Sequence, residues 1–339
     1  LSSLILFFLF ILLFLLGNWL GKKIANFTNI RLEVTVIKNR IKILYFFSAL
    51  FILIQYYCLN VIVDAYGGVS NLINLQATIA PLLKELNLTP YYALMILPLV
   101  SGHFLMIHKL RGRNIFFILS ILPFVLISRR SPILFAIIPY IYYYNYCRKK
   151  LSLFLVIIVG IILFLFFSAI VIYRINLYTE FDFLKFLRSP ENSIFDMLVI
   201  TIENRERLSY FFDWDYMVDN PELVREYYTG ALILNELFGF KYKGGAIPPT
   251  IVGSAYLWGG IIGLIFISIL VGIFLSFFHH MLKKSGDLVI FSGYLFFFAN
   301  QIILNGDLYL IIIQAIRYVV IALFLFVFFY KVKLKIGLK

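Results

Sequence analysis

The chain has 339 residues, of which 62% are hydrophobic and 14% are charged, with 37 Phe and 23 Tyr. A soluble domain of this size could not cover so much apolar surface, so the composition excludes a soluble protein and predicts a polytopic membrane protein. The net charge of +13 is therefore expected to reside in loops, where it reports topology and does not indicate nucleic-acid binding.

Nine apolar stretches along the chain are candidates for membrane-spanning helices. A span needs about 20 residues, and several of these stretches are shorter. The predicted spans are 1–20, 41–63, 91–108, 114–128, 132–147, 151–173, 250–280, 288–304 and 309–330. One further span upstream of Leu1 stays open. We expect an all-α polytopic membrane protein in which 1–339 is a single transmembrane domain.

The distribution of basic residues predicts the orientation. Placing five connecting segments on one side collects 18 of the 30 Lys and Arg there, with only Glu33 and Asp287 as acids. These segments are 21–42, 109–113, 148–150, 281–287 and 331–339. The positive-inside rule makes this side cytoplasmic. We therefore expect a cytoplasmic C-terminus in a plasma (inner) membrane.

The segments expected outside the cytoplasm are 64–90 and 174–249. The first is too short to span and has mixed helical spacing, which is typical of interfacial helices. The second contains two helix starts, Ser189-Pro190-Glu191 and Asn220-Pro221-Glu222, each with a capping residue, a proline and an early acid. Apolar residues follow both at helical spacing, and after the first start they are Phe195, Leu198, Val199 and Ile202. We expect two amphipathic helices that lie on the outer surface and cover a cavity between the spans.

The stretch 203–216 lies between these two helix starts and holds four acids, two arginines and five aromatic residues. Guanidinium groups bind phosphate through paired hydrogen bonds, aromatic faces stack on sugar rings, and a carboxylate accepts a proton from an attacking hydroxyl. The residues of interest are Glu203, Arg205, Arg207, Tyr210, Asp213, Trp214 and Asp215. For Glu203 and Arg207, four residues apart, an ion pair on a helix surface is an open alternative.

Further arginines lie at the outer ends of spans or inside one. Arg129 and Arg130 end the fourth span, Arg174 leaves the sixth, and Arg225 lies on the second amphipathic helix. Arg317 lies inside the last span, where a charge is costly unless it faces a cavity, a ligand or a partner. Two alternatives stay open: Arg317 pairs with a loop acid such as Asp307, or its side chain extends to the outer membrane interface. The ligand that fits such a cavity is a lipid-linked phosphate or pyrophosphate, and we expect no metal or other cofactor.

Four features occur together: Gly67-Gly68 after the second span, Ser128-Arg129-Arg130 at the end of a span, one dominant late outer loop, and the run 248–263 that ends it. In this combination the chain resembles the Wzy-type oligosaccharide repeat-unit polymerases of bacterial O-antigen and capsule assembly. Members commonly carry an acid in that final run, where this chain has Ser254. No Arg has Gly eleven residues later, so the Arg-x10-Gly motif of some members is missing.

The resemblance implies a glycosyltransferase that polymerises lipid-linked repeat units at the outer face of the membrane. The growing glycan would pass from its polyprenyl pyrophosphate to a sugar hydroxyl of a new unit, with a chain-length regulator and a flippase as partners. One of Glu203, Asp213 and Asp215 would be the base. Pyrophosphate would be bound by Arg129, Arg130, Arg174 and Arg317; the acceptor and loop would be held by Arg205, Arg207, Arg225, Tyr210 and Trp214.

Two other functions stay open from the sequence. One is an O-antigen ligase or another lipid-dependent glycosyltransferase, although such ligases usually carry a loop histidine and 174–249 contains none. The other is a lipid or polysaccharide transporter without chemistry. A transporter is expected to show related halves, and the sequence shows no internal repeat. Polar residues also gather on one predicted side only.

Overall fold

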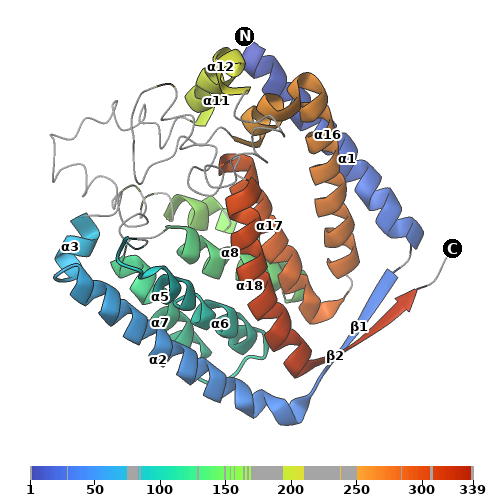
Figure 1. The fold of residues 1–339 in the computed structure, drawn as a ribbon. Helices are drawn as coiled ribbons and strands as arrows, with labels where there is room; N and C mark the ends of the chain where they lie inside the picture. The colour runs from blue at the N-terminus through green and yellow to red at the C-terminus, as the bar shows by residue number, and fades with distance from the viewer. Residues whose placement is uncertain are drawn as a thin grey trace.

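The structure is a computed structural model of the whole chain, shown in Figure 1. It describes residues 2–28, 30–74, 83, 85–127, 130–148, 150–152, 154–155, 157–162, 165, 168, 194–209, 237, 250–283, 285–305 and 308–336. The second predicted amphipathic helix, beginning at Asn220, lies outside these residues, as does most of the sixth predicted span.

Helices make up nearly all of the structure, as the composition predicts. They are α1 (Ser2–Thr28), α2 (Ile41–Ala65), α3 (Val69–Asn74), α5 (Thr89–Leu94), α6 (Leu97–Ile107), α7 (Arg113–Leu126), α8 (Arg130–Cys147), α11 (Ile194–Glu203), α12 (Arg205–Ser209), α16 (Thr250–Lys283), α17 (Val289–Asn305) and α18 (Leu308–Phe329). Short 3-10 helices cover Lys38–Arg40 and Gly286–Leu288. Four stretches in the described part are long and apolar enough to cross a membrane: Ser3–Thr28, Lys38–Ala65, Thr89–Ile107 and Thr250–Lys283.

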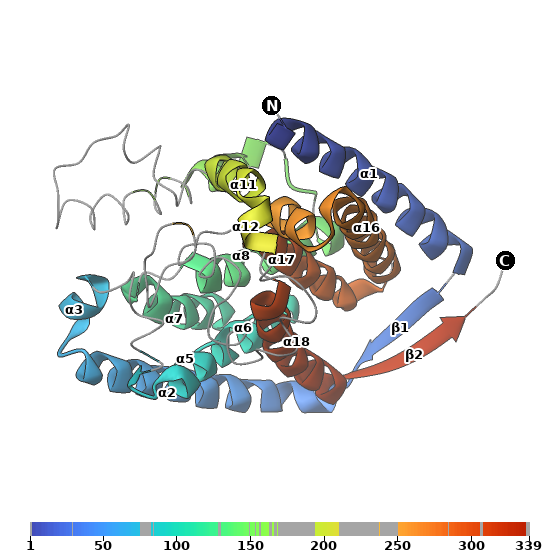
Figure 2. The same cartoon turned by 45° about the horizontal axis from the view of Figure 1, so that its top comes forward.

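The main hydrophobic core is formed where α2, α6, α7, α8, α17 and α18 pack together (Figure 2). Helix α6 lies near its centre, because Leu99, Val100 and Phe104 are fully buried. Helix α17 approaches α8 closely: a Cβ on Gly293 would lie 2.6 Å from the Cα of Pro139. The exposed side chains of α1, α2 and α16 are mostly large and apolar, as expected for helices that face lipid.

Helices α1 and α16 pack along much of their length through small residues. A Cβ on Gly17 would overlap the Ile269 carbonyl, one on Gly21 the Ile273 carbonyl, and one on Gly272 the Phe14 carbonyl. Glycines spaced in this way allow two backbones to approach closely, which drives helix association in a bilayer by van der Waals packing. The Gly17-x-x-x-Gly21 spacing in the sequence carried this signal.

A two-stranded antiparallel sheet adds to the predicted all-α architecture. Strand β1 (Ile30–Val36) pairs with β2 (Tyr330–Ile336) along their whole length, from Ile30 opposite Ile336 to Val36 opposite Tyr330. Both strands alternate polar and apolar residues with a period of two, which is a strand signal. The prediction that 21–42 and 331–339 are only connecting segments is therefore wrong for Ile30–Val36 and Tyr330–Ile336.

All five segments that the sequence analysis groups by their basic residues meet at one end of the structure. Hydrogen bonds join the Tyr45 hydroxyl to the Arg111 carbonyl (3.1 Å), the Arg148 guanidinium to the Ile107 carbonyl (2.9 Å), the Cys147 thiol to the Gly286 carbonyl (3.3 Å) and the Arg40 guanidinium to the Phe328 carbonyl (2.9 Å). We call this the basic end. Helices α11 and α12 lie at the end of the molecule away from the sheet (Figure 1).

Asp287 holds the basic end together. Its carboxylate accepts hydrogen bonds from the Tyr143 hydroxyl (3.0 Å) and the Tyr330 hydroxyl (3.2 Å). The Tyr330 hydroxyl proton is thus used in the bond to Asp287. Nε2 of His108 lies 2.8 Å from the Tyr330 hydroxyl oxygen, so this nitrogen is assigned as the donor in that contact. The network therefore joins α8, β2 and the residue after α6 in one arrangement.

Candidate functional site

Helix α16 is broken within the apolar run. Gly259 (φ −144°, ψ 18°) and Gly260 (φ 59°, ψ −143°) are not helical, so Thr250–Lys283 consists of two helical parts. The second conformation is accessible essentially to glycine alone. A Cβ on Gly263 would lie 2.5 Å from the Ala255 carbonyl oxygen, which shows how sharply the first part folds back. Broken helices occur at membrane depth where they are enclosed by protein or line a cavity, and they often mark binding sites.

A second, smaller core fixes the position of α11 against this break. Leu198 and Ile202 of α11 are buried against Ile251, Val252 and Ala255 of α16. Leu6 and Phe10 of α1 complete the same cluster. The predicted first amphipathic helix is thus present over Ile194–Glu203, with Leu198 and Ile202 on its buried stripe. Its packing partners are the starts of α1 and α16, so it covers the end of a helix bundle.

The acid and arginine cluster begins where α11 ends. Asn204 interrupts the helix: α11 ends at Glu203 and α12 begins at Arg205. Glu203 and Arg207 therefore belong to two different helices, although they are four residues apart in the sequence. Both side chains are exposed. The interruption directs Arg205 toward α16, while Leu208 is fully buried and anchors α12.

Arg205 lies directly on the break in α16. Its guanidinium carbon is 4.9 Å from the centre of the Tyr256 ring. A Cβ on Gly260 would lie 3.0 Å from Nη2 of Arg205, so the absence of a side chain at Gly260 makes room for the guanidinium. The Nε atom is shut off from solvent and has no hydrogen-bond partner in the part of the chain that the structure describes.

This arrangement concentrates positive potential. A cation over a tyrosine face gains about 0.5–2 kcal/mol, but a ring neutralises no charge. Among the described residues, no carboxylate is paired with Arg205. The helical part after Gly260 begins beside the guanidinium, and the free N–H groups of a helix start carry partial positive charge. Together, the guanidinium and the helix start form a site that suits an anion such as phosphate.

The structure joins two motifs that the sequence analysis treated separately. Arg205 comes from the stretch 203–216, and Tyr256 and Gly260 come from the exit run 248–263. Helix α12 packs mainly on α11 and α16. The sequence led us to predict that Arg205 holds the acceptor, and it gave no role to Tyr256 or to Gly259 and Gly260. The sequence signal for the break was the presence of two adjacent glycines inside an apolar span. Ser254, which replaces the expected acid, is 3% exposed and lies within this packed region.

The other predicted site residues are placed in part or not at all. The structure gives the place of two of them along a helix: Arg130 is the first residue of α8, and Arg317 lies within α18. Arg207 is exposed on α12. Seven predicted site residues lie outside the described part of the chain: Arg129, Arg174, Tyr210, Asp213, Trp214, Asp215 and Arg225.

The histidines of the spans have structural partners. His103 is fully buried, with Nε2 2.7 Å from the Ala136 carbonyl oxygen and Nδ1 2.7 Å from the Tyr294 hydroxyl. Since a carbonyl only accepts, Nε2 must carry the proton, and Nδ1 then accepts from Tyr294. His103 therefore ties α6 to α8 and α17 as a neutral packing residue.

Replacing His103 by leucine is expected to lower the thermal midpoint. Leucine is similar to histidine in size but is apolar, so the variant leaves the buried Tyr294 hydroxyl without its acceptor, at a cost of about 1–3 kcal/mol. Thermal unfolding of the purified protein in detergent measures the effect. Leu105→Met, an apolar exchange at a nearby buried position, controls for repacking. Equal midpoints for His103→Leu and the unaltered protein would contradict this role.

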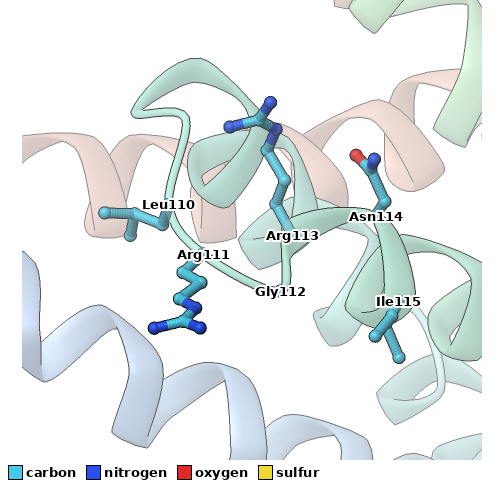
Figure 3. Close-up of a pocket in the computed structure, with 6 residues that line it drawn as sticks. All are labelled: Leu110, Arg111, Gly112, Arg113, Asn114 and Ile115. Carbon is cyan, nitrogen blue, oxygen red and sulfur yellow. The ribbon is translucent and has the colours of Figure 1, made fainter.

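A shallow hollow of about 320 Å³ is lined by Leu110–Ile115 at the basic end. Figure 3 shows the side chains of Arg111 and Arg113 pointing to opposite sides of the turn that connects α6 to α7. Their guanidinium groups do not converge on one ligand position. We therefore place the candidate site at the break in α16 and not in this hollow.

Comparisons with family models, with curated proteins and with solved structures find no match for the chain.

Proposed function

We propose that the protein polymerises lipid-linked oligosaccharide repeat units at the outer face of the plasma membrane. The observation that carries the proposal is the Arg205 guanidinium, which lies on the Gly259-Gly260 break with no carboxylate paired to it among the described residues. A positive group at a broken apolar helix suits the charged junction between a lipid and its glycan. The sequence resemblance supplies the class of reaction.

In the proposed reaction, the bond between the anomeric carbon of the growing glycan and its pyrophosphate oxygen breaks. The hydroxyl oxygen of the incoming repeat unit forms the new bond to that carbon, and polyprenyl pyrophosphate leaves. Charge develops on the leaving oxygen, where a positioned guanidinium stabilises it most. We assign Arg205 to this role in place of an acceptor role, and Arg129, Arg130, Arg174 and Arg317 remain proposed partners.

The proton of the acceptor hydroxyl must pass to a base. Glu203 is the candidate that the structure describes: it is exposed at the end of α11, two residues from Arg205. A carboxylate there is free to accept a proton in water-accessible surroundings. Asp213 and Asp215 remain the alternatives, and a comparison of the three Asp→Asn and Glu→Gln variants separates them.

The arrangement of the two ends supports the proposed orientation. The basic end collects most of the Lys and Arg, and α11, α12 and the break in α16 lie away from it (Figure 1). With the basic end in the cytoplasm, the candidate site opens on the outer side, where flipped repeat units arrive. A flippase and a chain-length regulator are the partners that this reaction requires or uses.

Replacing Arg205 by alanine is expected to reduce polymer formation about tenfold to a hundredfold, because a charge-assisted hydrogen bond contributes about 1.5–3 kcal/mol. Purified protein is incubated with a lipid-linked oligosaccharide and the products are separated on a gel. Arg205→Lys keeps the charge but loses the planar guanidinium group, so its polymer formation should lie between that of Arg205→Ala and that of the unaltered protein. Arg111→Ala, an exposed arginine at the basic end, is the control and should make a normal ladder.

The same assay separates the alternatives. A ladder supports a polymerase. A single transfer to a lipid A acceptor indicates a ligase, and an intact substrate with every acceptor leaves the transporter open. A ladder from Arg205→Ala equal to that of the unaltered protein would remove Arg205 from the site.

A further inference from the structure

The sheet of β1 and β2 has one polar and one apolar face. Successive side chains of a strand point to opposite faces, and partners in an antiparallel pair share a face. The register places Arg31 opposite Lys335, Glu33 opposite Lys333 and Thr35 opposite Lys331. The alternating positions are apolar in both strands. At the positions of one face the two strands therefore carry four basic residues and one acid. Among these, Glu33, Lys331 and Lys333 have exposed side chains. We call this face the basic face of the sheet.

The β1 part of the apolar face is turned toward the protein, whereas Val332 of β2 is 43% exposed. Leu32, Val34 and Val36 of β1 pack against the main core. Lys331 and Lys333 are exposed, as expected if the basic face points away from that core. Lys333 lies opposite Glu33, and neither lysine belongs to the Asp287 network or to the candidate site at α16. The positions of this face hold more basic residues than acids, so an excess of positive charge remains.

The sheet lies at the ends of two apolar helices. Helix α1, long and apolar enough to cross a membrane, ends at Thr28, and β1 begins at Ile30. Helix α18 ends at Phe329 and β2 follows at once. A sheet joined this closely to spanning helices lies at the depth of lipid headgroups. Further cations surround it: Lys22 and Lys23 in the last turns of α1, and Lys38, Arg40 and Lys42 after β1.

We propose that the basic face binds the headgroups of anionic phospholipids in the adjacent leaflet. Clustered Lys and Arg beside a membrane are attracted to anionic lipid. A zwitterionic headgroup attracts them less strongly, because its own ammonium group offsets the charge of its phosphate. Lysine is suited to this contact, since it acts as a flexible point charge and requires no fixed ligand geometry. The bound lipid stabilises the paired form of the sheet, because binding to the folded form alone shifts the opening equilibrium.

Amide hydrogen exchange tests the proposal on the full-length protein. The protein is reconstituted in nanodiscs of phosphatidylcholine alone or of equal parts phosphatidylcholine and phosphatidylglycerol. We expect the amides of Ile30–Val36 and Tyr330–Ile336 to exchange several-fold more slowly in the anionic discs. High salt should remove the difference, because screening weakens contacts between exposed charges. Exchange in the buried α6 serves as the internal reference.

Two triple variants separate charge from other effects. Lys331→Gln with Lys333→Gln and Lys335→Gln should lose the protection, whereas the corresponding three Lys→Arg changes should keep it. If the glutamine variant fails to fold, the salt dependence of the unaltered protein decides. Equal exchange in the two kinds of disc overturns the proposal. Protection that appears only when heparin, a soluble polyanion, is added to phosphatidylcholine discs also overturns it.

Discussion

Replacing Gly260 by alanine is expected to disable the candidate site while the protein stays folded. The backbone there has φ 59° and ψ −143°, and a residue with a side chain pays about 1–3 kcal/mol for such a conformation. The new methyl group would also lie 3.0 Å from Nη2 of Arg205, which forces the guanidinium to move. We expect ladder formation to fall at least about tenfold, because a loss of roughly 1.4 kcal/mol at the transition state gives that factor.

The neighbouring glycine provides a matched control. Gly259 has φ −144°, outside the left-handed region that favours glycine, and a Cβ there would meet no atom of the described part of the chain within 4 Å. Gly259→Ala should therefore keep both the ladder and the thermal midpoint, although it changes the same dipeptide. A Gly260→Ala protein that behaves like Gly259→Ala in both measurements would show that the break does not position Arg205.

Replacing Gly272 by leucine is expected to separate α1 from α16 and to give the largest loss of stability. The added side chain would meet the backbone of α1 at Phe14 and Asn18, the latter with its nitrogen 2.9 Å from the new Cβ. Backbone atoms cannot rotate aside as a side chain can, so the helices must move apart along a long contact. Overpacking costs about 1–3 kcal/mol and occasionally more. Yield from membranes and the thermal midpoint in detergent measure the effect.

Gly160→Leu is the control for this change. Gly160 lies in a helical stretch and is exposed, and no atom of the described residues lies within 4 Å of a Cβ placed there. The substitution adds the same apolar side chain to an apolar helix without a close backbone neighbour. We expect near-normal yield for Gly160→Leu. Comparable yield and midpoint for the two leucine variants would mean that α1 and α16 do not pack as the structure shows.

The two glycine predictions concern one assembly. The α1 and α16 pair holds the long part of α16, and the small core of α1, α11 and α16 holds the part before the break. Arg205 reaches Gly260 only because both are in place. We therefore expect Gly272→Leu to lower activity through folding and Gly260→Ala to lower it at the site, so the ratio of ladder formation to folded protein distinguishes them.

Sequence patterns predicted features that depend on local chemistry. The apolar excess indicated spanning helices, and four described stretches have the required length and composition. The proline-led start at Ser189-Pro190 predicted an amphipathic helix with Leu198 and Ile202 on its apolar stripe, and α11 buries both residues. These signals follow from helix periodicity and capping, which involve residues only a few positions apart.

Other features had a sequence signal that we did not read correctly. The alternating residues of Ile30–Val36 and Tyr330–Ile336 are typical of strands, but each is a single short segment without a neighbouring partner in the sequence. Their pairing links positions about three hundred residues apart, and no local pattern indicates which distant segment completes a sheet. Likewise, Gly259-Gly260 signals a break, but its direction depends on what packs on either side.

The sequence by itself determined that the chain is an apolar helical protein, that 18 of its 30 basic residues fall in five connecting segments, and that an acid and arginine cluster follows an amphipathic helix. Only the tertiary structure decided that Arg205 of this cluster lies on Tyr256 and Gly260, and that β1 joins β2. The physical reason is that composition and periodicity act within single helices and strands. The position of a charged group depends on the packing of several such elements, here the small core of α1, α11 and α16.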